Sequence, residues 1–280
     1  MSWETSGMTD PQRPQFGVIG GSGFYRFLDA AVEHEVSTPY GPPSAPVTIG
    51  SVQADTGPRA VAFLPRHGHR HEFPPHRVNF RANLWALRSV GVRQVIGPCA
   101  AGSLSPDLAP GSLVVPDQLV DRTTSRVQTY FDSGACHVDF ADPYCPRLRR
   151  DVLERMRTDG TEVVDGGTMV VIEGPRFSTR AESQWYAGLG WSLVNMTGHP
   201  EAVLARELGL CYTAVALVTD LDAGLAEGAG VSQAEVFAVF AEHSERLRLL
   251  LHEVVGSLSP ERGCPCARVH DQMTLPFELP

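Results

Sequence analysis

The chain has 280 residues, of which 42% are hydrophobic, 20% charged and 8% aromatic, a composition that excludes fibrous and disordered proteins. The formal net charge is -9 and there is no basic run, which argues against a surface that neutralises nucleic-acid or lipid phosphates. All 23 basic residues are Arg, so chemistry that needs a lysine amine is excluded, including Schiff-base catalysis and the lysine of Walker-type phosphate loops. We therefore expect a small-molecule substrate.

The first 14 residues are polar and interrupted by proline, without the apolar stretch of a secretory signal. No later stretch reaches the roughly 18 apolar residues of a membrane span. The six cysteines include no Cys-x-x-Cys motif and form no regular framework, which favours a reducing compartment. We expect a flexible tail at 1–14 and a cytoplasmic protein.

Strand-like and helix-like patterns alternate along the rest of the chain. Short apolar runs predict strands at 16–19, 47–52, 60–64, 94–96, 113–115, 168–172, 192–195 and 212–219. Apolar side chains at helical spacing predict helices at 79–90, 147–157, 180–188, 200–208 and 232–255. We therefore expect a single α/β domain at 15–256 with a mixed, mostly parallel central sheet flanked by helices, followed by a frayed C-terminal tail at 257–280.

The first candidate site is a glycine turn, GGSG at 20–23, directly after the strand predicted at 16–19. Successive backbone N–H groups and the hydroxyl of Ser22 can form a concave anion site there. The glycine order differs from the G-x-G-x-x-G fingerprint of dinucleotide-binding proteins. A simple tight turn that needs the positive φ values of glycine is an equally good interpretation.

Arginine and histidine cluster in the segment RHGHRH at 66–71, just after another predicted strand. An arginine at a strand end suits phosphate, because a guanidinium donates two parallel charge-assisted hydrogen bonds. A metal-dependent hydrolase built on His67, His69 and His71 is an alternative, and so are histidines that simply face solvent. We favour phosphate over metal because no further metal ligands are evident downstream.

Two more strand ends carry polar residues. In VNMTGHPE at 194–201, Thr197 precedes a predicted helix, where its hydroxyl could bind an anion that the helix dipole also favours; helix capping is the alternative. Asp220 and Asp222 follow an apolar strand and point to the same side of an extended chain. Two carboxylates held together there favour protonation of one of them, whereas an exposed turn is the alternative.

Cys264 and Cys266 form a Cys-x-Cys pair in the predicted C-terminal tail. Such a pair could close a strained disulfide or bind a metal, but we expect two free thiols.

From about residue 16 to about residue 255 the chain resembles the 5′-methylthioadenosine phosphorylases, within the trimeric purine nucleoside phosphorylases. The resemblance lies in the segments GVIGGSGFY (17–25), RHGHRH (66–71), NLWAL (83–87), GSLVVPDQLVDRTT (111–124), IEGPRFSTRAE (172–182), VNMTGHPEA (194–202) and ALVTDLD (216–222). It implies a pentosyltransferase of purine salvage that converts 5′-methylthioadenosine and inorganic phosphate to adenine and 5-methylthioribose 1-phosphate. It also implies that the reaction uses no metal and no organic cofactor.

The resemblance implies roles for individual residues. Phosphate would be bound by Ser22, Arg66, His67, Cys99, Ala100 (through its backbone) and Thr197. The nucleoside would be bound by Phe177, Ser178, Asn195, Met196, Asp220, Asp222, Gln233 and, from a neighbouring subunit of a homotrimer, His137. Family members often have Thr at the position of Cys99, and a thiol is a weaker donor than a hydroxyl.

Asp220 and Asp222 match the adenine-reading pair of the family. A carboxylate can accept a hydrogen bond from the 6-amino group, and a carboxylic acid, here Asp220, can protonate N7 of the departing base. Relatives that act on 6-oxopurines carry Asn at the position of Asp220 and Glu at that of Ser178, so both positions favour adenine. A broader purine nucleoside phosphorylase that accepts adenosine or inosine is the alternative within the family.

Gln233 falls where members that prefer a methylthio group have a small apolar residue. A buried amide beside a thioether would lack hydrogen-bond partners, at a cost of about 1–3 kcal/mol. A polar 5′ substituent is therefore an alternative, unless the amide turns away.

Overall fold

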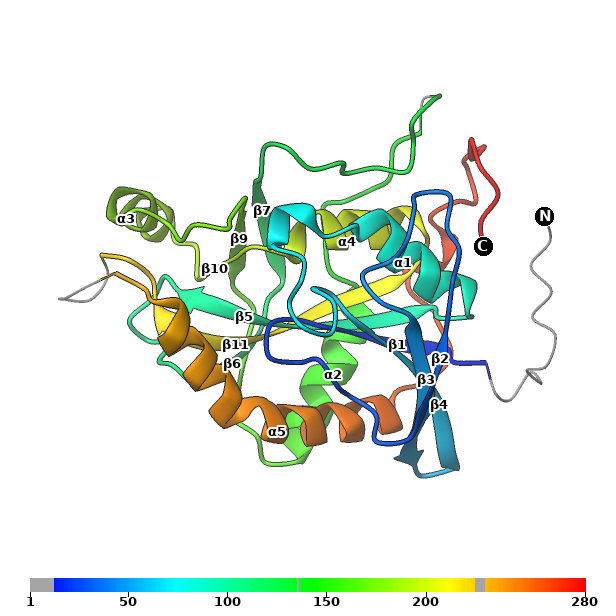
Figure 1. Ribbon diagram of the computed structural model, residues 1–280, viewed down its shortest axis with the longest axis horizontal. Coiled ribbons are helices and arrows are strands. Elements are labelled where there is room, and N and C mark those ends of the chain that lie inside the picture. Colours follow the sequence, from blue (N-terminus) through cyan, green and yellow to red (C-terminus); the bar gives the residue numbers. More distant parts are fainter. Residues whose placement is uncertain (1–12, 135, 225–229) are drawn as a thin grey trace.

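The computed structural model describes residues 13–134, 136–224 and 230–280 (Figure 1). The strands are β1 (Phe16–Gly20), β2 (Ala31–His34), β3 (Val47–Ala54), β4 (Gly57–Pro65), β5 (Gln94–Ser103), β6 (Leu113–Val115), β7 (Gln118–Arg122), β8 (Val163–Asp165), β9 (Thr168–Ile172), β10 (Leu193–Asn195) and β11 (Cys211–Leu221). The helices are α1 (Phe80–Ser89), α2 (Pro146–Thr158), α3 (Arg180–Gly188), α4 (Gly198–Glu207) and α5 (Gln233–Ser257), with short 3-10 helices η2 (Pro75–Arg77) and η3 (Pro265–Arg268).

Within the described ranges the strands form one mixed sheet. Its main path runs β2-β3-β4-β1-β5-β10-β9-β7, while β11 pairs with β5, β6 with β11 and β8 with β6. The pairs β1–β4, β1–β5, β5–β11, β6–β8, β7–β9 and β9–β10 are parallel, and the remaining four are antiparallel. This confirms the predicted mixed, mostly parallel sheet.

Strand β5 is the branch point of the sheet. It pairs with β1 through residues 94–96, with β11 along its length and with β10 through Gly102 and Ser103. The strands beside it therefore diverge towards its carboxyl end. In α/β proteins such an end, where neighbouring strands separate, is the usual place for a ligand.

Helices cover both faces of the sheet, α1 and α4 on one and α2 and α5 on the other (Figure 1). Strand β11 is buried on both faces because its side chains alternate between the two cores. Tyr212 and Ala214 pack in the core with α1 and α4, whereas Val215 and Leu217 pack in the core with α2 and α5. A near-continuous apolar run is the sequence pattern that such a central strand requires.

Two of the helices that carry site residues begin at capping side chains. The Thr179 side chain accepts from the backbone N–H of Glu182 at the start of α3, and the Glu182 carboxylate accepts from the N–H of Thr179 in return. Ser232 caps α5 by accepting from the N–H of Glu235. Such caps satisfy helix N–H groups that have no partner within the helix.

The predicted strand at 94–96 is too short. Strand β5 continues to Ser103 through Pro98, Cys99 and small residues, which have weak strand preference by themselves. It stays extended because β11 pairs with it along this stretch. Strands β2, β7 and β8 were not expected from the sequence, and two of them, β2 and β8, are short and mostly exposed.

The expectation of a frayed C-terminal tail at 257–280 is wrong. Leu258, Cys264 and Cys266 are buried, and the Phe277 ring lies 5.7 Å from that of Trp85. The segment is held by apolar contacts on the domain, which its proline-rich sequence did not reveal. The predicted tail at 1–14 lies outside the described residues except for residues 13 and 14.

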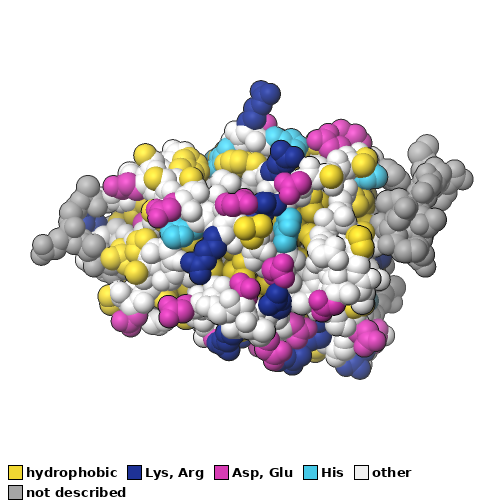
Figure 2. All heavy atoms as spheres, turned by 90° about the horizontal axis from the view of Figure 1, so that it is seen from below, with side chains coloured by type: hydrophobic (Ala, Val, Ile, Leu, Met, Phe, Trp, Pro, Cys, Tyr) yellow, Lys and Arg dark blue, Asp and Glu magenta, His cyan; other side chains and the backbone are white. Residues whose placement is uncertain are grey.

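Among the helices of the described residues, none combines the length and apolar character needed to cross a membrane. On the face shown in Figure 2, acidic and basic side chains of the described part are interspersed rather than gathered by sign. This distribution agrees with the absence of basic runs from the sequence.

Candidate active site

A cavity of about 310 Å³ lies at the carboxyl end of β5, between the ends of β1, β4, β10 and β11 and the first turns of α5. The residues that sequence analysis assigned to the site and that line it are Ser22, Arg66, His67, Cys99, Ala100, Phe177, Ser178, Asn195, Met196, Thr197, Asp220, Asp222 and Gln233. His137 is exposed and is not part of this lining.

The glycine turn after β1 brings Ser22 to the cavity. The turn closes with a hydrogen bond of 3.0 Å from the N–H of Phe24 to the carbonyl of Gly21, and Gly23 has a φ of 76°. A Cβ on Gly21 would lie 2.8 Å from Nη1 of Arg66, so this position has no room for a side chain. The turn therefore uses glycine both for its backbone angle and for close approach to Arg66.

Arg66 is buried and forms an ion pair beneath the cavity. Its Nε and Nη2 donate to the carboxylate of Glu201 at 2.6 and 2.8 Å, and Tyr212 donates its hydroxyl to the same carboxylate at 2.7 Å. Burial alone would lower the pKa of Arg66, but the carboxylate of Glu201 raises it, so the guanidinium stays charged. The bidentate edge expected to hold phosphate is therefore occupied by Glu201.

Part of the Arg66 guanidinium is left for a ligand. Nη2 also donates to the carbonyl of Ile19 at 3.1 Å, and Nη1 donates to that of Pro98 at 3.3 Å. A guanidinium has five N–H donors. One hydrogen on Nη1 therefore has no protein partner among the described residues.

His67 is a neutral ring in this site. Its Nδ1 lies 2.8 Å from the carbonyl oxygen of Phe73 and must donate to it. Burial, together with the nearby charge of Arg66, lowers the pKa of His67 to about 3. At neutral pH its Nε2 is therefore a hydrogen-bond acceptor.

The histidines do not converge on a metal. The rings of His67 and His71 stack with their planes 3° apart and their centroids 4.5 Å apart, and His71 is bonded to the Tyr25 hydroxyl at 2.8 Å. His69 is exposed and lies outside the cavity lining. This arrangement does not support the metal-dependent hydrolase alternative.

Asn195, the last residue of β10, contacts the start of α4 through its side chain. Its Oδ1 accepts from the backbone N–H groups of Thr197 and Gly198, both at 3.3 Å, and the Thr197 hydroxyl makes no capping bond. The hydroxyl is therefore available to a ligand, whereas these two N–H groups are not. The amide nitrogen of Asn195 and the hydroxyl of Ser178 are buried without a hydrogen-bond partner in the described part of the chain. Since both residues line the cavity, a ligand is the natural partner for them.

A β-bulge positions the acidic pair. Val218 of β11 lies opposite Ala101 of β5, but Asp220 lies opposite Gly102, so Thr219 is an additional residue. The Thr219 hydroxyl donates to the Asp220 carboxylate at 2.8 Å. A Cβ on Gly102 would lie 3.0 Å from that carboxylate, which explains a glycine at this position.

The two carboxyl groups of the pair have different surroundings. The pKa of Asp220 is raised to about 6, chiefly by burial and also by the nearby Asp222, against the hydrogen bond from Thr219, which lowers it. Asp222 is 3% exposed and accepts a hydrogen bond of 2.6 Å from the Ser183 hydroxyl. The sequence indicated repulsion between the two acids as the reason for protonation, but burial is the larger cause.

Apolar side chains complete the cavity. Phe177 comes from the loop before α3, and Met196 follows β10. Val236 and Phe237 of α5 also face the cavity, and Gln233, the first residue of that helix, is exposed. Because Gln233 is in contact with solvent, the cost expected for a buried amide does not apply.

Sequence reasoning missed several residues around the cavity. Glu201 forms the ion pair with Arg66, and Tyr212 donates a hydrogen bond to Glu201. Ser183 donates a hydrogen bond to Asp222, and Phe237 lines the cavity. The available signal was a charged residue, Glu201, directly before the apolar residues 202–205 of α4. Nothing in the sequence indicated that its partner would be Arg66, 135 positions away.

A family model for the phosphorylase superfamily matches residues 15–256. The chain belongs to the phosphorylase superfamily. Membership confirms the predicted enzyme class and sets the hydrolase alternative aside.

Relatives within the superfamily match nearly the whole chain. An S-methyl-5'-thioadenosine phosphorylase of Mycolicibacterium smegmatis is 62% identical over 265 residues, which cover 94% of this chain and 99% of the relative. A purine nucleoside phosphorylase of Streptomyces coelicolor is 56% identical over 284 residues, covering 98% and 100%.

Solved structures show the same fold. A methylthioadenosine phosphorylase from an antarctic soil metagenomic library superposes with a TM-score of 0.83 at 34% identity, covering 92% of this chain and 91% of the other. The Schistosoma mansoni methylthioadenosine phosphorylase in complex with adenine gives 0.81 at 36% identity, covering 86% and 91%.

Proposed function

We propose that this enzyme catalyses the phosphorolysis of 5′-methylthioadenosine to adenine and 5-methylthioribose 1-phosphate. One observation carries the proposal. A carboxyl group with a pKa of about 6, that of Asp220, lines the same cavity as the anion-binding candidates Ser22, Arg66 and Thr197. Orthophosphate and a purine can therefore be bound together, with an acid beside the base.

Phosphate is bound by donors from three strand ends. Ser22 and Thr197 supply hydroxyls, Arg66 supplies the remaining Nη1 hydrogen, and the Ala100 backbone lies beside them in the lining. Burial raises the pKa of the Cys99 thiol to about 11, so it is a weak S–H donor at neutral pH. The neutral His67 ring can accept a hydrogen bond from a protonated phosphate oxygen.

Adenine is bound beside the two aspartates. The Asp222 carboxylate, oriented by Ser183, accepts from the 6-amino group, and protonated Asp220 donates to N7. The ring packs against Phe177, and Met196 lies under the ribose. The small Ser178 leaves a hydroxyl donor or acceptor in place of the acid that 6-oxopurine relatives carry.

The reaction is a direct transfer of the pentosyl group. A phosphate oxygen forms a bond to the anomeric carbon as the bond from that carbon to N9 of the purine breaks. The electron pair of the broken bond passes into the purine, and the proton of Asp220 moves to N7. Asp220 regains a proton when the phosphate proton is released. Positioning, charge stabilisation and general acid assistance supply the rate, without metal or organic cofactor.

The 5′ end of the cavity favours an apolar substituent. Val236 and Phe237 face the cavity from α5, and Gln233 can keep its amide in water. Relatives named as S-methyl-5'-thioadenosine phosphorylases at 62% and 60% identity support this choice. A broader purine nucleoside phosphorylase is the second candidate, because the relative at 56% identity carries that name.

We also propose a cytoplasmic homotrimer in which each site is completed by the neighbouring subunit. His137 is exposed and absent from the cavity lining of its own chain, which leaves it free to reach a neighbour's cavity.

A nucleoside panel tests the substrate. At saturating phosphate we expect kcat/KM for 5′-methylthioadenosine to exceed that for adenosine, because burying a methylthio group against apolar side chains stabilises the complex, and inosine to react least. Equal values for methylthioadenosine and adenosine would favour the broader phosphorylase, and a preference for inosine would contradict the role of Asp220 and Asp222.

A further inference from the structure

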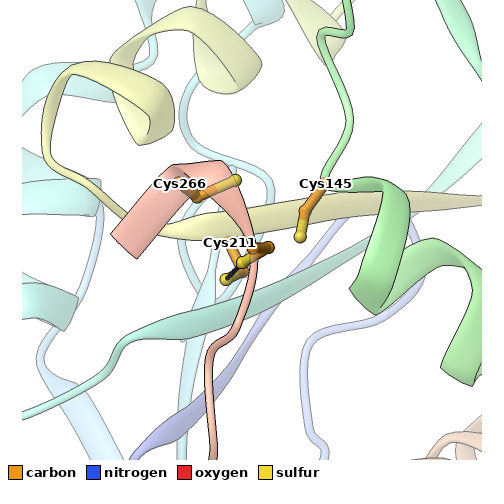
Figure 3. Close-up of side chains that lie close together, drawn as sticks. Cys145, Cys211 and Cys266 are labelled. Atoms are coloured by element: carbon orange, nitrogen blue, oxygen red, sulfur yellow. Dashed lines mark hydrogen bonds between the residues drawn. The ribbon is translucent and has the colours of Figure 1, made fainter. Parts of the chain in front are cut away.

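Four cysteine side chains meet on the α2 and α5 side of the sheet, and none of them lines the cavity (Figure 3). Cys145 immediately precedes α2, and Cys211 is the first residue of β11. Cys264 immediately precedes η3, and Cys266 lies within it. All four are buried, at 4% exposure or less.

The sulfur positions fit a tetrahedral metal site. The four Sγ atoms all lie within 4.8 Å of one another, and those of Cys211 and Cys264 are 3.3 Å apart. Zinc–sulfur bonds of about 2.3 Å in a tetrahedron place the sulfurs about 3.8 Å apart. Small side-chain rotations are therefore enough to bring all four sulfurs to one ion.

Two of the four sulfurs have an N–H donor beside them, an arrangement that suits thiolate ligands. The backbone N–H of Leu148 donates to Sγ of Cys145 at 3.5 Å, and Nη2 of Arg147 lies 4.0 Å from Sγ of Cys211. Such contacts orient metal ligands and offset the negative charge of a tetrathiolate site.

The backbone around the cluster is also fixed. The N–H of Cys145 donates to the carbonyl of Tyr212 at 2.8 Å, and the N–H of Ala267 donates to the carbonyl of Cys264 at 3.2 Å. The first bond joins the residue before α2 to β11, and the second closes the turn that carries Cys264 and Cys266, so neither depends on sulfur.

We propose that Cys145, Cys211, Cys264 and Cys266 bind one Zn²⁺ ion as thiolates. The four thiols release their protons to solvent as the ion binds, and four protein ligands leave no coordination position for substrate or water. Sulfur ligands select zinc over magnesium or calcium, which bind oxygen. The ion connects the C-terminal segment to β11 and α2, so its role is to stabilise the fold. This replaces the expectation that Cys264 and Cys266 are merely free thiols in a tail.

Metal analysis of the full chain tests the proposal. We expect the protein, purified under reducing conditions without chelator, to contain about one zinc ion per chain. Cys211→Ser and Cys266→Ser should lose the zinc and lower the Tm. Cys136→Ser is the matched control, because Cys136 is outside the cluster, and should keep it.

A spectroscopic measurement on the wild-type chain covers the case in which the serine variants do not fold. X-ray absorption at the zinc edge should give four sulfur ligands at about 2.3 Å, and a cobalt-substituted protein should show thiolate-to-cobalt charge-transfer bands. Protein free of stoichiometric metal, with the cluster either as four alkylatable thiols or as two disulfides, would overturn the proposal. Iron in place of zinc would overturn the choice of ion. Phosphate-dependent base release is measured separately, so its failure leaves the zinc result unaffected.

Discussion

Asp220 is the residue on which the proposed chemistry depends. Its pKa of about 6 arises chiefly from burial at the bulge in β11, where Gly102 leaves room for the carboxylate. A carboxyl group with a raised pKa is protonated below that value and loses its proton as the pH rises through it. In the free enzyme the fraction of protonated Asp220 therefore falls above about pH 6. Binding of a purine whose N7 accepts a hydrogen bond from Asp220 favours the protonated form.

Replacing Asp220 with Asn tests the acid. We expect turnover of 5′-methylthioadenosine to fall by about 10²–10⁴-fold, because a general acid typically contributes that much. When the same nucleoside is methylated at N7, its base leaves without needing a proton, so Asp220→Asn should lower its turnover far less. With this methylated nucleoside, kcat/KM of the wild-type enzyme should no longer decline above about pH 6.

The control is binding of phosphate, which Asp220→Asn should change little. Equal losses of turnover for the methylated and unmethylated nucleosides would show that Asp220 acts in some other way than as an acid.

Individual residues of the site differ in how far sequence could predict them. Asp220 and Asp222 could be predicted because they end an apolar run and share one side of an extended chain. Glu201 could not, since its role is to pair with Arg66 and that contact exists only in the folded sheet. The same holds for the cysteine cluster, whose members lie as far apart in sequence as Cys145 and Cys266.

Strand ends form the proposed anion-binding part of the site. β1 ends in the turn with Ser22, and β4 ends just before Arg66, whose guanidinium is already bonded to Glu201 of α4. Removing Arg66 alone therefore leaves a buried carboxylate without its partner, which costs about 3–5 kcal/mol of stability. The effect of removing Arg66 on phosphate binding therefore has to be separated from its effect on stability.

Two substitutions separate the effects. Ser22→Ala should raise the KM for phosphate by about tenfold to a hundredfold at unchanged Tm, because one hydrogen bond to an anion is lost while the backbone of the turn, which the half-buried Ser22 side chain does not close, stays intact. Arg66→Ala should raise the KM and also lower the Tm. The double variant Arg66→Met/Glu201→Gln should regain the Tm but not the KM, as measured by phosphate saturation and thermal unfolding.

Recovery of the phosphate KM in the double variant would mean that Arg66 only supports the fold. An unchanged KM in Ser22→Ala would remove the glycine turn from the anion site.

At the scale of elements, sequence predicted the central strands and most helices but not their full extents. Strands β1, β9 and β11 are apolar because they are buried on both faces, and such runs can be recognised. The sequence predicts only residues 94–96 of β5, because the small residues that follow stay extended only through pairing with β11. The bulge at Thr219 has no local signal, because it exists as a mismatch between two strands.

The whole molecule belongs to the phosphorylase superfamily, and we expect it to act as a trimer in which His137 serves a neighbouring site. Mixed trimers test this. In the proposed trimer Asp220→Asn and His137→Ala would impair the same site from two different subunits, so coexpression in equal amounts should restore about a quarter of the sites. Activity should exceed the mean of the two parent variants.

Light scattering of the wild-type enzyme should give a mass of three chains. Activity of the mixed preparation at the mean of its parents would show that His137 does not reach a neighbour's site.

The most direct test of the account is release of adenine from 5′-methylthioadenosine with and without orthophosphate, followed by identification of the sugar product. We predict that release requires orthophosphate and yields one molecule of 5-methylthioribose 1-phosphate for each adenine. Release at the same rate without phosphate, with free methylthioribose as the product, would contradict it.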